Sequence, residues 1–216
     1  MGRISGSRNR DHDDTRARLV QSLAQQMLQA GGTQPSLRTL AEGAGVDPGT
    51  LRHYFGDRRG VVQAAFEHLL GAGKEPTDRA RALAALPARE ALHQLLEQIS
   101  AAWAGALGGM HAAGFAEGMA DSELGQTYVS VILEPTLSVV EELLISFHAR
   151  GELSVPNARV GALALLSPVL LALFHQHQLQ GRRCRPLDMA SFVEQHLAGF
   201  LRGYEKNSNV VPPRGE

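Results

Sequence analysis

Apolar residues recur along this chain at the three- and four-residue spacing of an α-helix, whereas the alternating pattern of a β-strand is scarce. Residue types that favour helices, chiefly alanine, leucine, glutamine, glutamate and arginine, dominate the periodic segments. We therefore predict an all-α protein with about nine helices. After three N-terminal helices, the expected helices lie near residues 58–70, 88–107, 110–119, 122–150, 157–180 and 188–205. Pro135 should kink or break the helix that contains it.

The most informative pattern lies at residues 37–55, LRTLAEGAGVDPGTLRHYF. Its first part is an apolar stripe of about two helical turns, made of Leu37, Leu40, Ala41 and Ala44. Ser36 is placed to cap this helix, and Gly45 can take the left-handed conformation that ends it. Asp47 followed by Pro48 is typical of the cap and first residue of a second helix. Two short helices joined by a tight turn are a helix-turn-helix, which predicts DNA binding.

The second helix of this pair has an inner and an outer face. At about 100° per residue, Leu51 and Phe55 project together and must face the core. The residues that then point away from the core are Gly49, Thr50 and His53. Arg52 and Tyr54 lie on the flanks, where they could reach the phosphates of a major groove that the helix has entered. The alternative is an ordinary helical hairpin inside an all-α bundle.

These residues resemble the N-terminal pattern of the tetracycline-repressor (TetR) family of transcriptional regulators. The pattern stands here as Leu40-Ala41, Ala44-Gly45-Val46, Gly49-Thr50-Leu51, Tyr54-Phe55, Arg58 and Val61, within about residues 14–70. Arg52 departs from it, because an aromatic residue is usual there, and Arg58 replaces a usual lysine. The resemblance implies a DNA-binding set made of Arg38, Thr39, Pro48, Gly49, Thr50, Arg52, His53, Tyr54 and Arg58. Arg58 is expected to hold a phosphate beside the N-terminus of the next helix.

We expect two domains, a DNA-binding domain at residues 1–72 and an effector-binding and dimerisation domain at residues 73–216. Glycine, proline and charge interrupt the helical pattern at residues 71–88, which makes this segment the expected boundary. Residues 1–70 carry nine arginines against seven acidic residues, while the whole chain has a net charge of −1. This modest asymmetry only supports the assignment. Arg3, Arg8 and Arg10 are expected to lie in a solvated, disordered tail, and the alternative is an arm that touches phosphates or the minor groove.

The last two expected helices resemble the pair through which the family dimerises as a four-helix bundle. The implied interface residues are Leu163, Leu166, Leu170, Phe174, Phe192, Val193, His196, Leu197 and Phe200. The alternative is that these apolar stripes are core within one chain. In a twofold dimer, two recognition helices would enter successive major grooves about 34 to 36 Å apart, so the expected operator is a palindrome.

If the resemblance holds, a small-molecule effector binds among the middle helices and weakens DNA binding. Large apolar side chains with a few polar groups would suit a flat or lipophilic ligand. The candidate residues are Trp103, Met110, His111, Phe115, Met119, Tyr128, Phe147, His148 and His175. Each of them could equally be ordinary core. The glycines at residues 105–118 either leave room for a ligand or loosen the helix.

The sequence lacks the usual marks of an enzyme or a metalloprotein. A strand-anchored GxGxxG, a P-loop and a GxSxG elbow are absent. Cys184 is the only cysteine, so neither an intrachain disulfide nor a four-cysteine zinc site is possible. The apolar run at residues 160–174 is too short for a membrane span and is interrupted by Pro168. We expect no cofactor, no bound metal and no membrane partner.

The sequence therefore predicts a cytoplasmic, homodimeric regulator that binds double-stranded DNA, a repressor relieved by a small, mostly apolar ligand. Two alternatives remain. One is a helical ligand-binding or enzymatic bundle without DNA function, and the other is an activator of the same fold. The sequence identifies neither the effector nor the operator.

Overall fold

The computed structural model describes residues 5–72 and 74–205. Within these ranges the chain is helical without strands, which confirms the predicted fold class. The first helices are α1 (Ser5–Gln29), α2 (Leu37–Gly43), α3 (Pro48–Phe55), α4 (Arg58–Ala72) and α5 (Lys74–Ala82), which the 3₁₀ turn η1 (Leu83–Ala85) follows. The rest are α6 (Ala88–Ala102), α7 (Gly108–Ala120), α8 (Ser122–Tyr128), α9 (Glu134–Ala149), α10 (Ala158–His177), α11 (Gly181–Cys184) and α12 (Met189–Gly203). Two π-helical turns, η2 (Trp103–Leu107) and η3 (Val129–Leu133), join α6 to α7 and α8 to α9.

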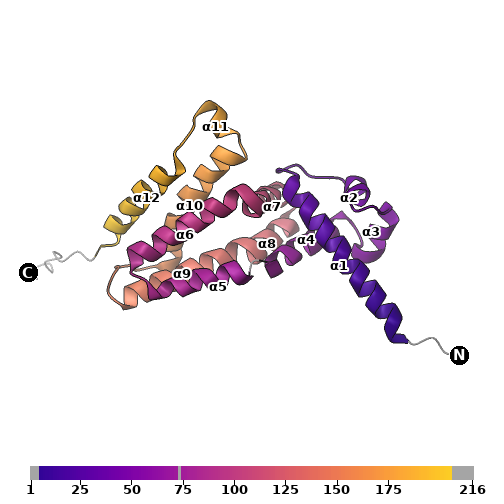
Figure 1. The fold of residues 1–216 in the computed structure, drawn as a ribbon, viewed down its shortest axis with the longest axis horizontal. Coiled ribbons are helices and arrows are strands. Elements are labelled where there is room, and N and C mark those ends of the chain that lie inside the picture. The colour runs from indigo at the N-terminus through magenta and orange to yellow at the C-terminus, as the bar shows by residue number, and fades with distance from the viewer. Residues whose placement is uncertain (1–4, 73, 206–216) are drawn as a thin grey trace, which may run out of the picture.

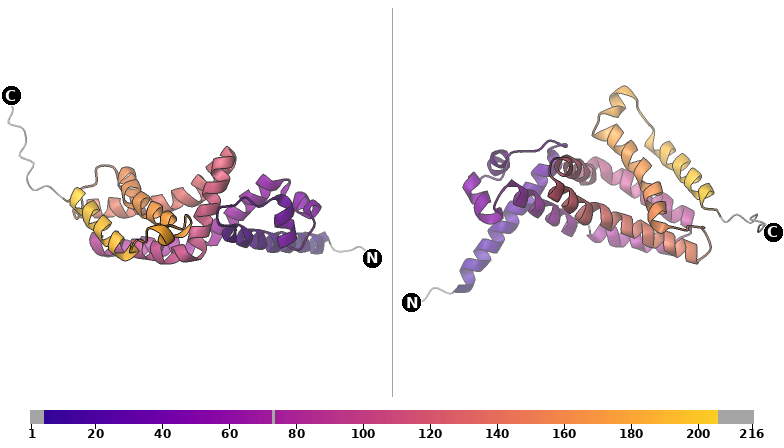
Figure 2. Two further views of the ribbon diagram at one scale, coloured as in Figure 1. Left: turned by 90° about the horizontal axis from the view of Figure 1, so that it is seen from above. Right: turned by 180° about the vertical axis from the view of Figure 1, so that it is seen from behind.

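The helices form a small head and a longer body (Figure 1). Helices α1, α2 and α3 make the head, and α4 runs from it against the body. The described end of α12 lies at the far end of the body from the head, which both views of Figure 2 also show. This arrangement leaves α2 and α3 at one extremity of the molecule.

Three groups of buried apolar side chains hold this arrangement together. The head core consists of Leu19, Leu23, Leu40, Ala41, Leu51 and Val61. The junction core, between head and body, consists of Ala24, Met27, Val62, Ala65, Phe66, Ala113, Leu124, Tyr128 and Ile132. The larger body core draws on α5, α6, α9, α10 and α12. Since α1 and α4 contribute to both the head core and the junction core, the head is packed against the body rather than merely tethered to it.

Proline and glycine set the irregular turns of the body. Pro135 occupies the second position of α9, directly after the π-helical turn η3, so the prediction of an interrupted helix near Pro135 is confirmed. Gly105 is the non-helical residue inside η2, with φ −94° and ψ −134°. It separates α6 from α7, as the predicted break between residues 107 and 110 required. In α10, by contrast, the helix continues through Pro168.

Two local predictions were wrong. The expected helices leave out residues 71–87, whereas the structure has helix α5 and the turn η1 there. Pro76 lies in the first turn of α5, where the backbone N–H groups have no partner within the helix and a proline is tolerated. The expected N-terminal tail is helical from Ser5, and residues 1–4 lie outside the described part.

The glycines of α7 serve close packing rather than leaving space for a ligand. A Cβ atom on Gly114 would lie 2.1 Å from the ring of Tyr128, and one on Gly109 would lie 2.3 Å from the carbonyl oxygen of Leu28. A Cβ atom on Gly118 would lie 2.9 Å from the Cα atom of Gly125 in α8. Helix α7 therefore approaches α1 and α8 at distances that a larger residue would prevent.

The junction encloses a polar pair, His111 of α7 and Tyr128 of α8. His111 Nδ1 lies 2.6 Å from the Tyr128 hydroxyl oxygen, and both residues are 3% exposed. Burial penalises charge on either group, so it lowers the pKa of His111 to about 4 and raises the pKa of Tyr128. His111 is therefore neutral in the folded protein at pH 7.

This burial predicts a specific acid sensitivity. Between about pH 6.5 and about pH 4 the unfolded chain protonates His111 while the folded chain does not, so the free energy of unfolding falls as the pH falls. The loss approaches about 3 kcal/mol near pH 4. Urea unfolding of the wild type and of His111→Gln at several pH values measures it. The variant should lose this part of the pH dependence, whereas His68→Gln, at an exposed position, should retain it. Equal pH dependence in the wild type and His111→Gln would contradict the burial argument.

Candidate functional site

The turn between α2 and α3 is built by the capping residues that the sequence predicted. Ser36 Oγ accepts a hydrogen bond from the backbone N–H of Thr39 at 3.1 Å. Gly45 has φ +69°, the left-handed conformation that lets the chain leave α2. Asp47 Oδ1 accepts from the backbone N–H of Thr50 at 3.1 Å, and Pro48 is the first residue of α3. The helix-turn-helix is thus fixed by local chemistry at both of its ends.

Helix α3 has the orientation that its spacing predicted. Leu51 is fully buried in the head core, and Phe55 packs against that core from its edge. Gly49, Arg52 and His53 are exposed. The outer face of α3 is therefore polar and open to solvent, which is what a helix needs to enter a groove.

The remaining predicted DNA-binding residues of α2 and α3 are partly engaged with their neighbours. Arg38 is exposed and pairs with Glu42 one turn along α2, at 2.9 Å. The Thr39 hydroxyl oxygen lies 2.8 Å from that of Ser36. Pro48, Thr50 and Tyr54 are half-buried, and the Thr50 hydroxyl donates to Asp47 Oδ2 at 2.6 Å. The Arg52 side chain, in contrast, has no hydrogen-bond or ion-pair partner among the residues that the structure describes.

The sequence did not point to the part that α1 plays at this face. The His12 ring lies 4.6 Å from the Tyr54 ring and 6.0 Å from the His53 ring, between centroids. The Arg16 guanidinium lies 5.4 Å above the ring of Phe55. No short sequence motif links α1 to α3. Only the folding of the head brings His12 and Arg16 of α1 next to the aromatic side chains of α3.

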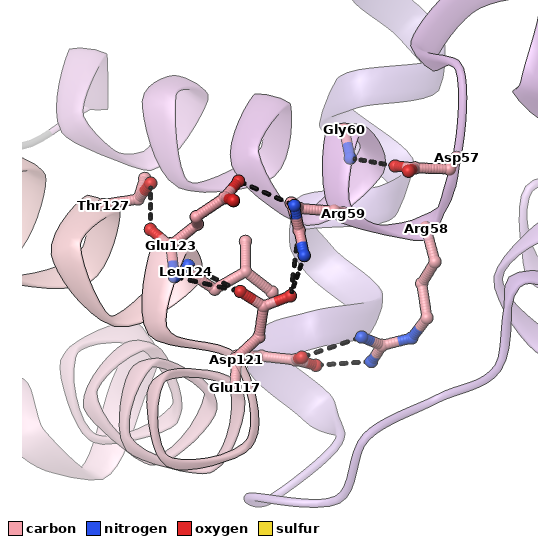
Figure 3. Close-up of polar contacts among 9 residues, drawn as sticks. All are labelled: Asp57, Arg58, Arg59, Gly60, Glu117, Asp121, Glu123, Leu124 and Thr127. Atoms are coloured by element: carbon pink, nitrogen blue, oxygen red, sulfur yellow. Dashed lines mark hydrogen bonds and ion pairs between the residues drawn. The ribbon is translucent and has the colours of Figure 1, made fainter.

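Arg58 is placed differently from its prediction. Its Nη1 and Nη2 atoms donate to the two carboxylate oxygens of Glu117 in α7 at 2.8 and 2.6 Å, and its Nε donates to the Pro35 carbonyl oxygen at 2.8 Å (Figure 3). Glu117 is 1% exposed. The expectation that Arg58 holds a phosphate is corrected, because its guanidinium points into the body and already has a buried counter-ion. The hydrogen bonds to Glu117 raise the pKa of Arg58.

A second arginine of α4 reaches the body beside the first. Arg59 Nε donates to Asp121 Oδ2 at 2.9 Å, and Nη1 donates to Glu123 Oε2 at 2.7 Å (Figure 3). The Gln34 side chain, from the loop before α2, donates to the Ala116 carbonyl oxygen at 2.6 Å. The start of α4 therefore contacts both α7 and the start of α8, and the loop before α2 contacts α7.

The body contains a cavity of about 690 Å³ between α6, α7, α9 and α10. Its lining residues are Ala80, Leu95, Gln98, Ile99, Ala102, Leu107, His111, Phe115, Met119, Leu133, Thr136, Leu137, Val139, Val140, Leu163, Leu166, Ser167, Leu170, Leu171, Phe174 and Leu179. The lining is mainly apolar, and its volume is typical of small-molecule sites. Phe115, Met119 and Leu171 are exposed and lie at its open side.

Three of the nine predicted effector residues line this cavity, namely His111, Phe115 and Met119. Trp103 and Tyr128 are buried next to the lining, where Trp103 stacks on the His111 ring at 5.1 Å between centroids and Tyr128 bonds His111. The other four candidates lie elsewhere. Met110 packs on the junction core, Phe147 belongs to the body core, and His148 and His175 are exposed. Helical periodicity alone could not distinguish a cavity wall from the core behind it.

The nine residues implied as a dimer interface divide between the inside and the outside of the chain. Leu166, Val193, Leu197 and Phe200 are buried in the body core of the single chain, so for them the alternative reading as core is the better one. Leu170, Phe174, Phe192 and His196 are half-buried, and Leu163 is 41% exposed. A partner chain would instead meet the residues that α10 exposes. The exposed stripe of α10 consists of Val160, Leu163, Ala164, Ser167, Pro168, Leu171 and His175.

Helix α10 is also long and apolar enough to cross a membrane, with a mean hydropathy of 1.7 over 18 residues. It packs against α9 and α12, and seven of its apolar or small residues are buried there with Gln176. One side of α10 is thus buried in the body, and the other side carries an exposed, mainly apolar stripe.

Comparison with known proteins gives a relative in sequence for part of the chain. No family model matches the chain. It is 32% identical over 82 residues to the HTH-type transcriptional regulator BetI of Stenotrophomonas maltophilia, a match that covers 38% of this chain and 42% of BetI. The chain thus matches less than half the length of these curated relatives.

Similarity to solved structures extends over most of the chain. A TetR-family regulator from Rhodococcus, itself named as putative in its description, superimposes with a TM-score of 0.62 at 21% identity, covering 88% of this chain and 98% of that one. The regulator FadR of Bacillus subtilis, solved in complex with stearoyl-CoA, superimposes with a TM-score of 0.62 at 15% identity, covering 87% and 98%. The chain therefore has the fold of TetR-family transcriptional regulators, and part of its sequence is similar to the HTH-type regulator BetI.

Proposed function

We propose that this protein is a DNA-binding transcriptional regulator, a repressor that a small, mostly apolar ligand releases from its operator. The observation that carries the proposal is the capped helix-turn-helix at one extremity of the molecule, with the outer face of α3 open to solvent. In this reading Gly49 allows close approach to base edges, and His53 and Thr50 read bases while Arg52 and Tyr54 contact the backbone. A cytoplasmic location follows from such a role.

The functional unit would be a homodimer on a palindromic operator. The support is the exposed stripe of α10, in which Val160 is 55%, Leu163 41% and Leu171 69% exposed, although Leu163 and Leu171 also line the cavity. Contiguous apolar surface of this kind marks protein interaction sites. Pairing α10 with its twofold copy would place two α3 helices on one face of the DNA. We divide the chain accordingly into a DNA-binding domain at residues 1–72 and an effector and dimerisation domain at residues 73–216.

The link between the two domains would be α7. Its residues His111 and Phe115 line the cavity, and Glu117 holds Arg58 at the start of α4. Because α3 ends at Phe55 and α4 begins at Arg58, a displacement of α7 by a ligand would change the position of α3. The ligand and the DNA would then favour different arrangements of the same joint, and each would weaken the binding of the other.

Two further functions are weaker. An activator of the same fold would use the same surfaces, and a reporter gene under the regulated promoter distinguishes it from a repressor by the sign of the response to gene deletion. A ligand-binding or enzymatic bundle without DNA function would leave the capped helix-turn-helix unexplained.

DNA recognition can be tested with the DNA upstream of the protein's own gene. Arg52→Ala and His53→Ala should each weaken binding by about 1 to 3 kcal/mol, because each removes a contact from α3, and His53→Ala should also alter base preference. Gel shifts at moderate salt measure the affinities. Arg202→Ala, which removes an exposed arginine from α12, is the control and should bind normally. Sequence-selective binding that persists unchanged in both α3 variants would refute the assigned face, and no selective binding by the wild type would refute the function.

If the dimer forms through α10, a charged substitution should weaken dimer formation on α10 but not on α9. Val160→Glu should shift the protein towards the monomer, because it puts a charge into an apolar interface, and it should weaken binding to a palindromic site. Sedimentation equilibrium measures the shift. Ile145→Glu is the control, since Ile145 is 58% exposed on α9 away from the stripe. If both variants sediment as the wild type does, the α10 interface is wrong.

The junction ion pair predicts unequal costs for two neighbouring arginines. Arg58→Ala leaves the Glu117 carboxylate buried without its counter-ion and should lower the free energy of unfolding by about 3 kcal/mol. Arg59→Ala removes two partly exposed ion pairs, to Asp121 and Glu123, and should cost about 1 kcal/mol or less. Urea unfolding of both variants at pH 7 gives the comparison. Similar small losses in the two would show that Glu117 does not depend on Arg58.

A further inference from the structure

We propose that His111 presents its Nε2–H group to the 690 Å³ cavity as its hydrogen-bond anchor, and that the cavity takes an uncharged, mostly apolar molecule with a carbonyl or hydroxyl oxygen. The inference rests on the proposed function, since it names the chemical class of that function's effector. It depends on the position of one side chain and on the character of the wall around it.

The first step is that His111 Nε2 opens onto the cavity. Only 3% of the His111 surface is exposed, yet the residue belongs to the cavity lining. Its one hydrogen bond joins Nδ1 to Tyr128, and Nε2 has no partner among the described residues. Every fully buried side-chain nitrogen and oxygen atom in that part of the chain does have a partner. Nε2 therefore keeps access to open space, and the cavity is the space that His111 borders.

The second step concerns the proton. The Tyr128 hydroxyl is buried, and His111 Nδ1 is its one acceptor among the described residues. The hydroxyl hydrogen must therefore point to Nδ1, because a buried donor without an acceptor is costly. A neutral imidazole that accepts at Nδ1 carries its proton at Nε2. The group that faces the cavity is thus a donor, and it requires an oxygen or nitrogen acceptor on the occupant.

The third step is the absence of charge from the wall. The described lining residues include no lysine, arginine, aspartate or glutamate. The other polar members are Gln98 and Ser167, which are exposed, and Thr136, whose hydroxyl donates to the Ile132 carbonyl oxygen at 3.2 Å. A carboxylate, phosphate or ammonium group buried against this wall would lose its hydration without gaining a counter-ion. A neutral molecule incurs no such loss.

The fourth step is the shape of the apolar wall near the anchor. The Phe115 and Phe174 rings meet edge to face with their centroids 5.0 Å apart. The Trp103 ring stacks on the ring of His111. Phe115 is 47% and Met119 87% exposed at the open side. An occupant that accepts from Nε2–H would cover these two side chains with its apolar part, which favours binding by removing apolar surface from water.

Three ten-carbon probes test the charge preference: 2-decanone, decanoate and decylammonium. Trp103 is the sole tryptophan and stacks on His111, so its fluorescence reports occupancy without a label. At pH 7.5 the ketone should bind to the full-length protein at least about tenfold more tightly than either ion. Equal or tighter binding of decanoate or decylammonium, or no binding of the ketone, overturns the proposal.

Variants of His111 test the anchor. His111→Asn keeps an amide near the Tyr128 hydroxyl but offers no donor at the Nε2 position, and it should weaken 2-decanone binding by about tenfold. His111→Gln carries an amide nitrogen close to the Nε2 position and should restore part of the affinity. His68→Asn, at an exposed position of α4 outside the cavity, is the matched control, and circular dichroism verifies the fold of each variant. Unchanged affinity in a folded His111→Asn overturns the anchor, as does equal weakening in the Gln and Asn variants.

The same preparations separate this inference from the proposed function. A ketone that binds as expected but leaves DNA affinity unchanged supports the ligand class and contradicts the effector role. Normal DNA binding together with preferential binding of an ion contradicts the ligand class alone.

Discussion

The buried carboxylate of Glu117 is the constraint on which the joint between head and body depends. A carboxylate at 1% exposure needs a counter-ion and hydrogen-bond donors, and Arg58 supplies two donors in the planar geometry that a carboxylate matches. The Nε–H group of the same guanidinium donates to the Pro35 carbonyl oxygen, just before α2. One ion pair thus fixes α7, the start of α4 and the loop before the helix-turn-helix relative to one another. The apolar junction core also stabilises the contact between these elements, but apolar contacts do not require the defined orientation that hydrogen bonds require.

Much of the head was predictable because its structure is determined locally. Caps, a left-handed glycine and the three- and four-residue spacing act within a few residues of each other, so Ser36, Gly45, Asp47 and Leu51 reveal their roles in sequence. Arg58 fails for the opposite reason. Its partner Glu117 is 59 residues away, and a cation before a helix looks the same in sequence whether it faces a phosphate or a buried carboxylate. His12 escaped prediction similarly, since its neighbours in α3 come from tertiary packing.

The body shows where helical periodicity stops being informative. A stripe of large apolar residues predicts a buried face, but it does not say whether the face meets another helix, a cavity or a second chain. Leu197 and Phe147 proved to be core, His111 and Phe115 to border a cavity, and Val160 to be exposed. The distinction depends on how three or four helices from distant parts of the chain diverge. The glycines of α7 illustrate the same limit, since the contacts that require them lie on α1 and α8.

The contact between Gly118 and Gly125 has a consequence for how the protein can change over evolutionary time. A side chain on Gly118 would collide with the backbone of α8, and one on Gly125 would be tightly packed against the backbone of α7, so replacing Gly118 requires α7 and α8 to move apart. Some aliphatic residues of the cavity wall, such as Leu163 and Leu171, are exposed, and these can be exchanged for others of similar size. Under the proposed function, mutational drift can therefore alter which molecules the body binds while the joint between body and head stays the same. A lineage of such proteins could acquire new chemical signals one wall residue at a time.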